Sequence, residues 1–168
     1  VAHAHIPAGG AEGVLIAQGG QFAGWSLFVK DSRLVYEHNY VGLERYRVTS
    51  EVAIPAGKVS LGLEFAITGQ FEITPELTAM GIQGVSGQAT LYINDRPVGS
   101  GLIAKTVPFG WSLSGEGLCC GFDSETPVSE LYQSPLKFNG DLERVVVSVS
   151  GKPYENLALE VRQGFLIQ

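Results

Sequence analysis

The fold is decided by residues 59–68, which read V-S-L-G-L-E-F-A-I-T. Apolar side chains occupy every second position from Val59 to Ile67, and small or polar side chains mostly stand between them. Because successive side chains of a β-strand point to opposite faces, this period of two predicts a strand with one buried face. The alternation of Val145, Val147 and Val149 predicts a second strand of the same kind.

Similar short segments recur along the chain, and turn sequences separate them. Turns are predicted at Lys30–Ser32, at Asn94–Asp95 and at Asn139–Asp141, where Asn, Asp and Gly cluster. Further strands are expected at residues 13–17, 24–30, 34–39, 46–52, 90–93, 101–107 and 157–161. Residues 69–87 read as a long irregular connection, in which Pro75–Met80 is compatible with one turn of helix. Many short strands with regular turns predict an all-β fold, an antiparallel sandwich of a single domain over residues 1–168.

Composition excludes several classes of partner. The net charge is -6, and the 11 Lys and Arg residues are scattered singly. Proteins that bind nucleic acid use clustered basic residues to neutralise phosphates, so we expect no nucleic-acid partner. No apolar run approaches the roughly 18 residues that a membrane span requires, so we expect no membrane partner either.

Residues 118–129, L-C-C-G-F-D-S-E-T-P-V-S, contain both cysteines of the chain. A nucleophilic cysteine needs a nearby base, usually a histidine, and the three histidines are far away in sequence. Adjacent cysteines do not have the paired spacing of a zinc site, and a disulfide between neighbours is strained. The favoured interpretation is that Cys119 and Cys120 face opposite sides of a strand, one of them in the core.

The same segment offers a candidate metal site. The carboxylates of Asp123 and Glu125 are the hard oxygen donors that calcium prefers, and they define a calcium candidate. The alternative is that these acids cap a turn. No other cofactor is expected, and no catalytic residue is assigned. No dinucleotide, phosphate-loop or nucleophile-elbow motif occurs.

Aromatic residues supply the candidates for ligand binding, because rings can form a face on which a sugar stacks. Trp111 and Tyr132 are the two candidates, and a glycan is the ligand they suggest. Rings also fill sandwich cores, and Trp25, which alternates with Leu27, is expected to point inward. Sandwich glycosidases carry closely spaced acids on one strand face, and no such E-x-D-x-x-E arrangement is present.

Several blocks, read in order, resemble one family. They are residues 7–20 (P-A-G-G-A-E-G-V-L-I-A-Q-G-G), 24–31 (G-W-S-L-F-V-K-D), 41–46 (V-G-L-E-R-Y), 89–94 (A-T-L-Y-I-N) and 126–129 (T-P-V-S). Together they resemble the C-terminal domain of large bacterial arylsulfatases, over about residues 6–149. The matching positions are mostly glycines and apolar strand residues. Residues 69–87, the cysteine pair and the segment after Gly151 depart from the family pattern.

The resemblance implies a jelly-roll sandwich of the concanavalin A-like or laminin G-like kind, at the C-terminal end of a longer chain. It implies that sulfate esters are hydrolysed by a separate catalytic domain, the expected partner in cis, on a formylglycine made from a C/S-x-P-x-R motif. Neither Cys119 nor Cys120, and no serine of the chain, fits that motif. The expected role is therefore a non-catalytic accessory domain. The alternatives are a lectin-like carbohydrate-binding module and, with less support, a sandwich glycosidase. A bacterial periplasmic or extracellular location is compatible with the resemblance.

Overall fold

The computed structural model describes residues 1–79, 83–107 and 117–150. Nearly all of its regular structure is β-strand, as the sequence predicts. The strands are β1 (Ala2–Ile6), β2 (Gly13–Gly20), β3 (Ala23–Lys30), β4 (Arg33–Tyr40), β5 (Glu44–Thr49), β6 (Gly57–Phe71), β7 (Gly84–Ile93), β8 (Arg96–Ile103), β9 (Leu118–Cys120), β10 (Phe122–Asp123), β11 (Leu136–Lys137) and β12 (Asp141–Val145). A short helix, α1 (Pro75–Ala79), lies between β6 and β7.

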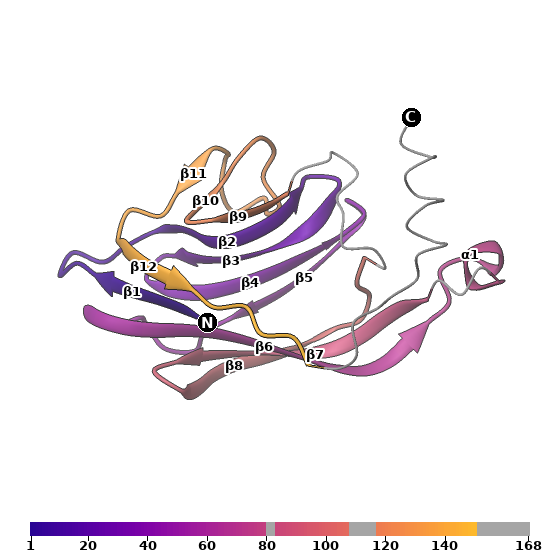
Figure 1. Cartoon of the computed structure of the whole chain (residues 1–168), viewed down its shortest axis with the longest axis horizontal. Coiled ribbons are helices and arrows are strands. Elements are labelled where there is room, and N and C mark those ends of the chain that lie inside the picture. The colour runs from indigo at the N-terminus through magenta and orange to yellow at the C-terminus, as the bar shows by residue number, and fades with distance from the viewer. Residues whose placement is uncertain (80–82, 108–116, 151–168) are drawn as a thin grey trace.

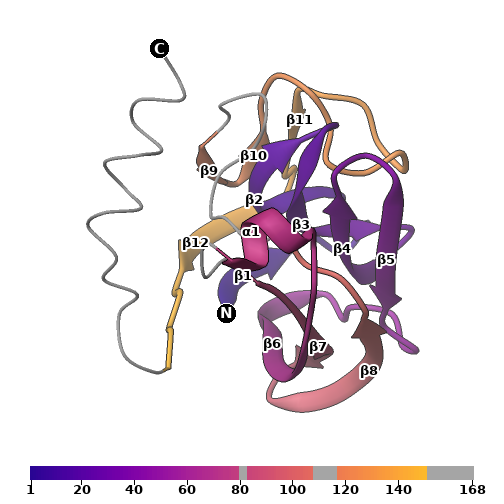
Figure 2. The same ribbon diagram turned by 90° about the vertical axis from the view of Figure 1, so that its right-hand side faces the viewer.

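Two sheets form the two layers of the molecule (Figures 1 and 2). Within the described residues, one sheet has five strands in the order β12-β1-β6-β7-β8. The other has seven, in the order β10-β11-β2-β3-β4-β5, with β9 also paired to β2. All pairings are antiparallel except that of β11 with β2, so the second sheet is mixed. The predicted all-β sandwich is confirmed at this level.

The main core lies between the two sheets. The stretch that decides the fold supplies one wall of it, since Val59 and Leu61 are buried and Leu63 and Phe65 pack against them from half-buried positions. The facing sheet contributes inward-pointing residues of β2, β3 and β4, among them Leu27. Burying a side chain of this size stabilises the fold by about 2 kcal/mol. The alternation read from the sequence therefore corresponds to the core face of β6.

A second, smaller apolar layer covers the outer face of the seven-stranded sheet. Residues 124–135, which connect β10 to β11, fold back over that face, and their Val128 and Tyr132 pack on Val14, Phe28 and Val35. The Tyr132 and Phe28 rings meet edge to face, with centroids 5.0 Å apart and an interplanar angle of 72°. The sheet is consequently buried on both faces, which explains why β2 and β4 are buried at almost every position.

The two sheets approach closely along one edge, where β5 lies beside β8. A Cβ atom on Gly99 would lie 2.7 Å from the Thr49 carbonyl oxygen, which is closer than real Cβ contacts. Next to this point, the Glu51 amide donates a hydrogen bond to the Val98 carbonyl at 2.6 Å. Glycine at position 99 is therefore required for the sandwich to close at this edge.

The turns predicted at Lys30–Ser32 and Asn94–Asp95 and the predicted helical turn are confirmed. The turn predicted at Asn139–Asp141 is only a bend at Gly140, and Asp141 already belongs to β12. Asn94 and Asp95 have φ angles of 49° and 61°, the left-handed values of a tight hairpin between β7 and β8. Asp31 and Ser32 have φ angles of 50° and 59° between β3 and β4. The strand expected at residues 157–161 lies outside the described residues.

The strand predicted through Val149 is wrong, because β12 ends at Val145. Val145 pairs with Ala2, the first residue of β1. The Val146 amide donates a hydrogen bond to the carbonyl of Val1, just before that strand, at 2.8 Å. Beyond that contact, residues 147–150 pair with no strand among the described residues and have no regular structure. Alternation alone predicts a strand, but a strand also needs a partner for its backbone groups.

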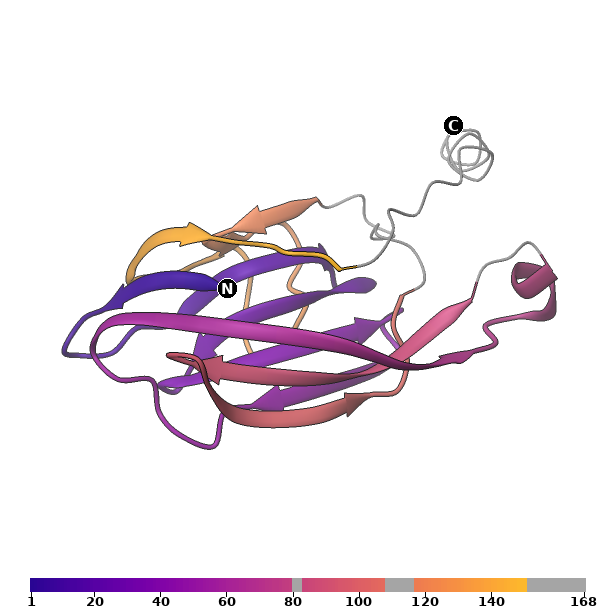
Figure 3. The ribbon, with the colours of Figure 1, turned by 60° about the horizontal axis from the view of Figure 1, so that its bottom comes forward.

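Two other predicted boundaries need correction. The irregular connection covers residues 72–83 rather than 69–87, since β6 and β7 stay paired as far as Phe71 and Gly84. Figure 3 shows these two strands running on beyond their neighbours, with α1 at their tip. The strand expected at 101–107 ends at Ile103, and the chain then crosses from one sheet towards the other.

Candidate functional site

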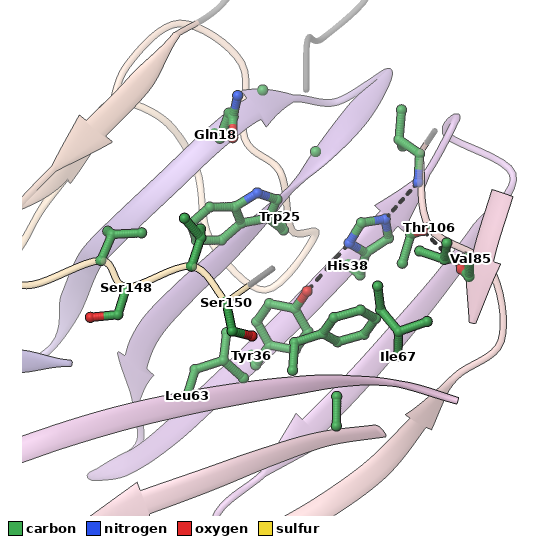
Figure 4. A pocket seen from close by; sticks show the side chains of 17 residues that line it. Gln18, Trp25, Tyr36, His38, Leu63, Ile67, Val85, Thr106, Ser148 and Ser150 are labelled. Carbon is green, nitrogen blue, oxygen red and sulfur yellow. Dashed lines mark hydrogen bonds between the residues drawn. The ribbon is translucent and has the colours of Figure 1, made fainter. Parts of the chain in front are cut away.

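A cavity of about 660 Å³ lies between the two sheets, towards the end where β6 and β7 run on (Figure 4). Small-molecule sites in proteins are commonly concave and of roughly this size, about 300–1,000 Å³. Its described lining comes from β2, β3 and β4 on one side and from β6 and β7 on the other, with residues 106–107 and 147–150 between them. This cavity is the candidate functional site.

One wall of the cavity is a row of side chains across the seven-stranded sheet. Gln18 is paired with Trp25, and Trp25 is paired with His38. Trp25 points inward, as the sequence predicts, and packs against the core. The opposite wall is apolar and is formed mainly by Leu63, Phe65, Ile67 and Val85.

The polar centre of the cavity is the pair formed by Tyr36 and His38, two residues apart on β4. The Tyr36 hydroxyl lies 3.3 Å from Nδ1 of His38, and Nε2 of His38 accepts a hydrogen bond from the Val107 amide at 3.1 Å. The first contact joins neighbouring inward positions, whereas the second anchors the crossing segment to the sheet. His38 therefore has a structural role in addition to lining the cavity.

Burial determines the protonation of this pair. It lowers the pKa of His38 to about 4, so the imidazole is neutral at pH 7. Because Nε2 accepts the Val107 hydrogen bond, the ring hydrogen resides on Nδ1 and is donated to the Tyr36 oxygen. Burial also raises the pKa of Tyr36, so the phenol keeps its hydrogen. No other hydrogen bond of the Tyr36 hydroxyl occurs within the described part of the chain.

The described lining contains no Asp, Glu, Lys or Arg. The Thr106 hydroxyl is already bonded to the Val85 carbonyl at 2.8 Å. A charged ligand would lose its hydration without gaining an ionic partner among these residues, which is costly. The arrangement suits a neutral and largely apolar molecule.

The cysteine pair lies away from this cavity, in β9 on the edge of β2. Both thiols are free. Cys120 is exposed and Cys119 is half-buried, with its Sγ 3.8 Å from the Ser124 hydroxyl. The expectation that one of them lies in the core is wrong, because β9 is a short edge strand whose two faces both reach solvent.

The two calcium candidates occupy different environments. Asp123 is buried, and its Oδ2 accepts hydrogen bonds from the Tyr132 hydroxyl at 2.5 Å and from the Val128 amide at 3.2 Å. Glu125 is exposed. In residues 1–79, 83–107 and 117–150, no three His, Cys, Asp or Glu side chains are grouped to hold a metal ion. Calcium at Asp123 and Glu125 stays a prediction.

Of the two ligand candidates, Tyr132 is not among the residues that line the cavity. Tyr132 is buried against the outer face of the seven-stranded sheet, and burial together with the Asp123 bond raises the pKa of its phenol. Its oxygen also lies 3.1 Å from the Ser26 hydroxyl. Trp111 lies outside the described residues, and its role in binding stays a prediction.

The buried carboxylate of Glu37, which is paired with the exposed Arg47, was not expected from the sequence. Glu37 is fully buried, and its Oε2 accepts a hydrogen bond from Nε of Arg47 at 2.5 Å. Its Oε1 has no hydrogen-bond partner in the described structure. The polar residue Glu37 alternates with apolar neighbours, which usually indicates a solvent-facing position. Only the covering loop makes it an interior one.

No protein-family model, curated protein or solved structure matches this chain. Among the described helical residues, none form a helix long and apolar enough to cross a membrane.

Proposed function

We propose that this chain is the non-catalytic accessory domain of an arylsulfatase, a jelly-roll sandwich that packs on the catalytic domain of the same protein. The observation that carries the proposal is an exposed apolar rim at the mouth of the cavity. Ile67, Val147 and Val149 line this rim and are 65%, 61% and 92% exposed. Large apolar side chains that gather at one exposed place commonly mark a contact with another protein surface.

The family resemblance supports the identity of the partner. The resembling blocks build β2, most of β3 and the end of β7, which form much of both core walls. The chain contains no C/S-x-P-x-R motif, so in this proposal sulfate ester hydrolysis takes place on the catalytic domain. The accessory domain stabilises that domain and shapes the approach to it.

The two alternative functions receive less support. A glycan-binding face needs accessible rings, and the hydroxyl of Tyr132 is buried and already bonded to Asp123. A sandwich glycosidase needs a pair of accessible acids. Glu37 and Asp123 are 0% and 1% exposed, so a sugar cannot reach them without displacement of the loop above.

The test uses the full-length natural protein that contains this chain. Its upstream sequence should carry a C/S-x-P-x-R motif, and the protein should hydrolyse p-nitrophenyl sulfate. In that protein the double substitution of Ile67→Lys and Val149→Lys should reduce soluble yield or change KM. The matched control is Leu102→Lys, at a position 61% exposed on the outer face of β8, and it should change neither. An upstream region without the motif, or identical behaviour of the two variants, would refute the proposal.

A further inference from the structure

The geometry points to the cavity between the sheets as a binding site for a neutral, aryl-rich small molecule that carries a single hydrogen-bond acceptor, such as a diaryl ketone. Most of the described lining is apolar, it has no charged side chain, and the phenol hydrogen of Tyr36 is available inside. The site is separate from the buried cluster around Asp123 and from the cysteines of β9. It does not rest on the proposed accessory role, and the test uses this chain alone.

The shape and the surface of the cavity favour a ligand with aromatic rings. A cavity of about 660 Å³ has room for a ligand with two or more rings. Trp25 and Phe65 lie on opposite walls, one on β3 and one on β6, so a flat ring between them would contact an aromatic surface on both sides. Aromatic rings gain from such contacts beyond the area that they bury.

The direction of hydrogen bonding at Tyr36 and His38 favours a ligand that accepts a hydrogen bond. The Val107 amide fixes the tautomer of His38, and His38 in turn donates its Nδ1 hydrogen to the Tyr36 oxygen. Accepting that hydrogen bond polarises the phenol, so Tyr36 becomes a better donor. The relay therefore presents one donor to the cavity, and the complementary ligand group is an acceptor, such as a carbonyl oxygen.

The lining of the cavity disfavours sugars and anions. A sugar brings several hydroxyl groups that must each find a partner, and leaving them unpaired in an apolar site costs about 1–3 kcal/mol each. The Thr106 hydroxyl is occupied by Val85, and the rest of the described lining is mostly aliphatic or aromatic, with Gln18, Ser148 and Ser150 as its polar side chains besides Tyr36 and His38. An anion is disfavoured because the lining supplies no cation. A neutral aryl ketone fits all three conditions.

The experiment compares benzophenone with diphenylmethane, which has a similar shape but carries CH₂ in place of the carbonyl. Both are titrated into the ¹⁵N-labelled chain at pH 7, and amide shifts are followed at Gly24, Val85 and Thr106. Benzophenone should bind about fivefold more tightly, the value of one neutral hydrogen bond. Tyr36→Phe should remove this difference by weakening benzophenone alone. If Tyr36→Phe does not fold, the comparison of the two ligands on the unchanged chain still decides.

Two further measurements locate the site. Val85→Trp should fill the cavity and weaken both ligands more than tenfold, whereas Leu102→Trp, on the outer face, should weaken neither. Benzophenone also labels nearby C–H bonds under ultraviolet light, and mass spectrometry should find the label on Leu63, Ile67 or Val85. Equal affinities for the two ligands, unchanged binding in Val85→Trp, or label spread over the surface would overturn the inference.

Discussion

Replacing Tyr132 by Phe removes one hydroxyl group from the layer on the outer face of the seven-stranded sheet. That hydroxyl donates to the buried Asp123 carboxylate at 2.5 Å and lies 3.1 Å from the Ser26 hydroxyl. The substitution keeps the ring, so the edge-to-face contact with Phe28 at 5.0 Å is retained. The change in stability therefore reports on the polar cluster and not on apolar packing.

The magnitude follows from the acceptor. A hydrogen bond to a charged group contributes about 1.5–3 kcal/mol, and an acceptor left short of a donor in the interior bears its desolvation cost. Asp123 is 1% exposed, so solvent cannot replace the lost donor. We expect Tyr132→Phe to lower the free energy of unfolding by about 2–3 kcal/mol. With an m-value of about 2 kcal/mol/M, the urea midpoint falls by roughly 1–1.5 M.

The assay is equilibrium urea unfolding at pH 7, followed by far-ultraviolet circular dichroism. The matched control is Tyr92→Phe, which removes a hydroxyl bonded at 2.8 Å to Glu64 on the exposed outer face of the other sheet. Water replaces that partner, so the midpoint should stay close to that of the unchanged protein. Equal midpoints for the two variants would refute the assignment of Asp123 and Tyr132 as a stabilising pair.

Three other substitutions test the fold and the cavity. Burial lowers the pKa of His38 to about 4, so unfolding takes up a proton between about pH 4 and 6.5. The free energy of unfolding that the neutral His38 contributes is complete above that window and falls by about 3 kcal/mol as the pH drops through it. His38→Gln should therefore flatten the pH dependence of urea unfolding between these pH values. Gly87→Ala places a Cβ 2.4 Å from the Phe65 ring and should lower the thermal midpoint by several degrees, whereas Gly9→Ala, with nothing within 4 Å, should not. Val41 has a φ of 46°, which strains a β-branched residue, so Val41→Asn should raise stability by about 1 kcal/mol in the same urea assay.

The candidate site was only partly accessible from the sequence. Tyr36 and His38 stand two apart in a predicted strand, so their sharing of one face could be read in advance. Their meeting with Val107 could not, because it depends on the crossing of residues 104–107 between the sheets. The cavity also depends on tertiary structure, because strands of both sheets line it.

The sequence by itself determined the local features of this protein. Alternation in Val59–Phe65 set the core face of β6, and Asn94–Asp95 set a tight hairpin, because both depend on neighbouring residues only. The tertiary structure alone decided where polar groups end up. Glu37 and Asp123 became interior residues because residues 124–135 cover the outer face of a sheet, and Val147 and Val149 are exposed because no strand of the described structure lies beside them. Burial of a group depends on what packs against it from distant parts of the chain, and periodicity carries no record of that.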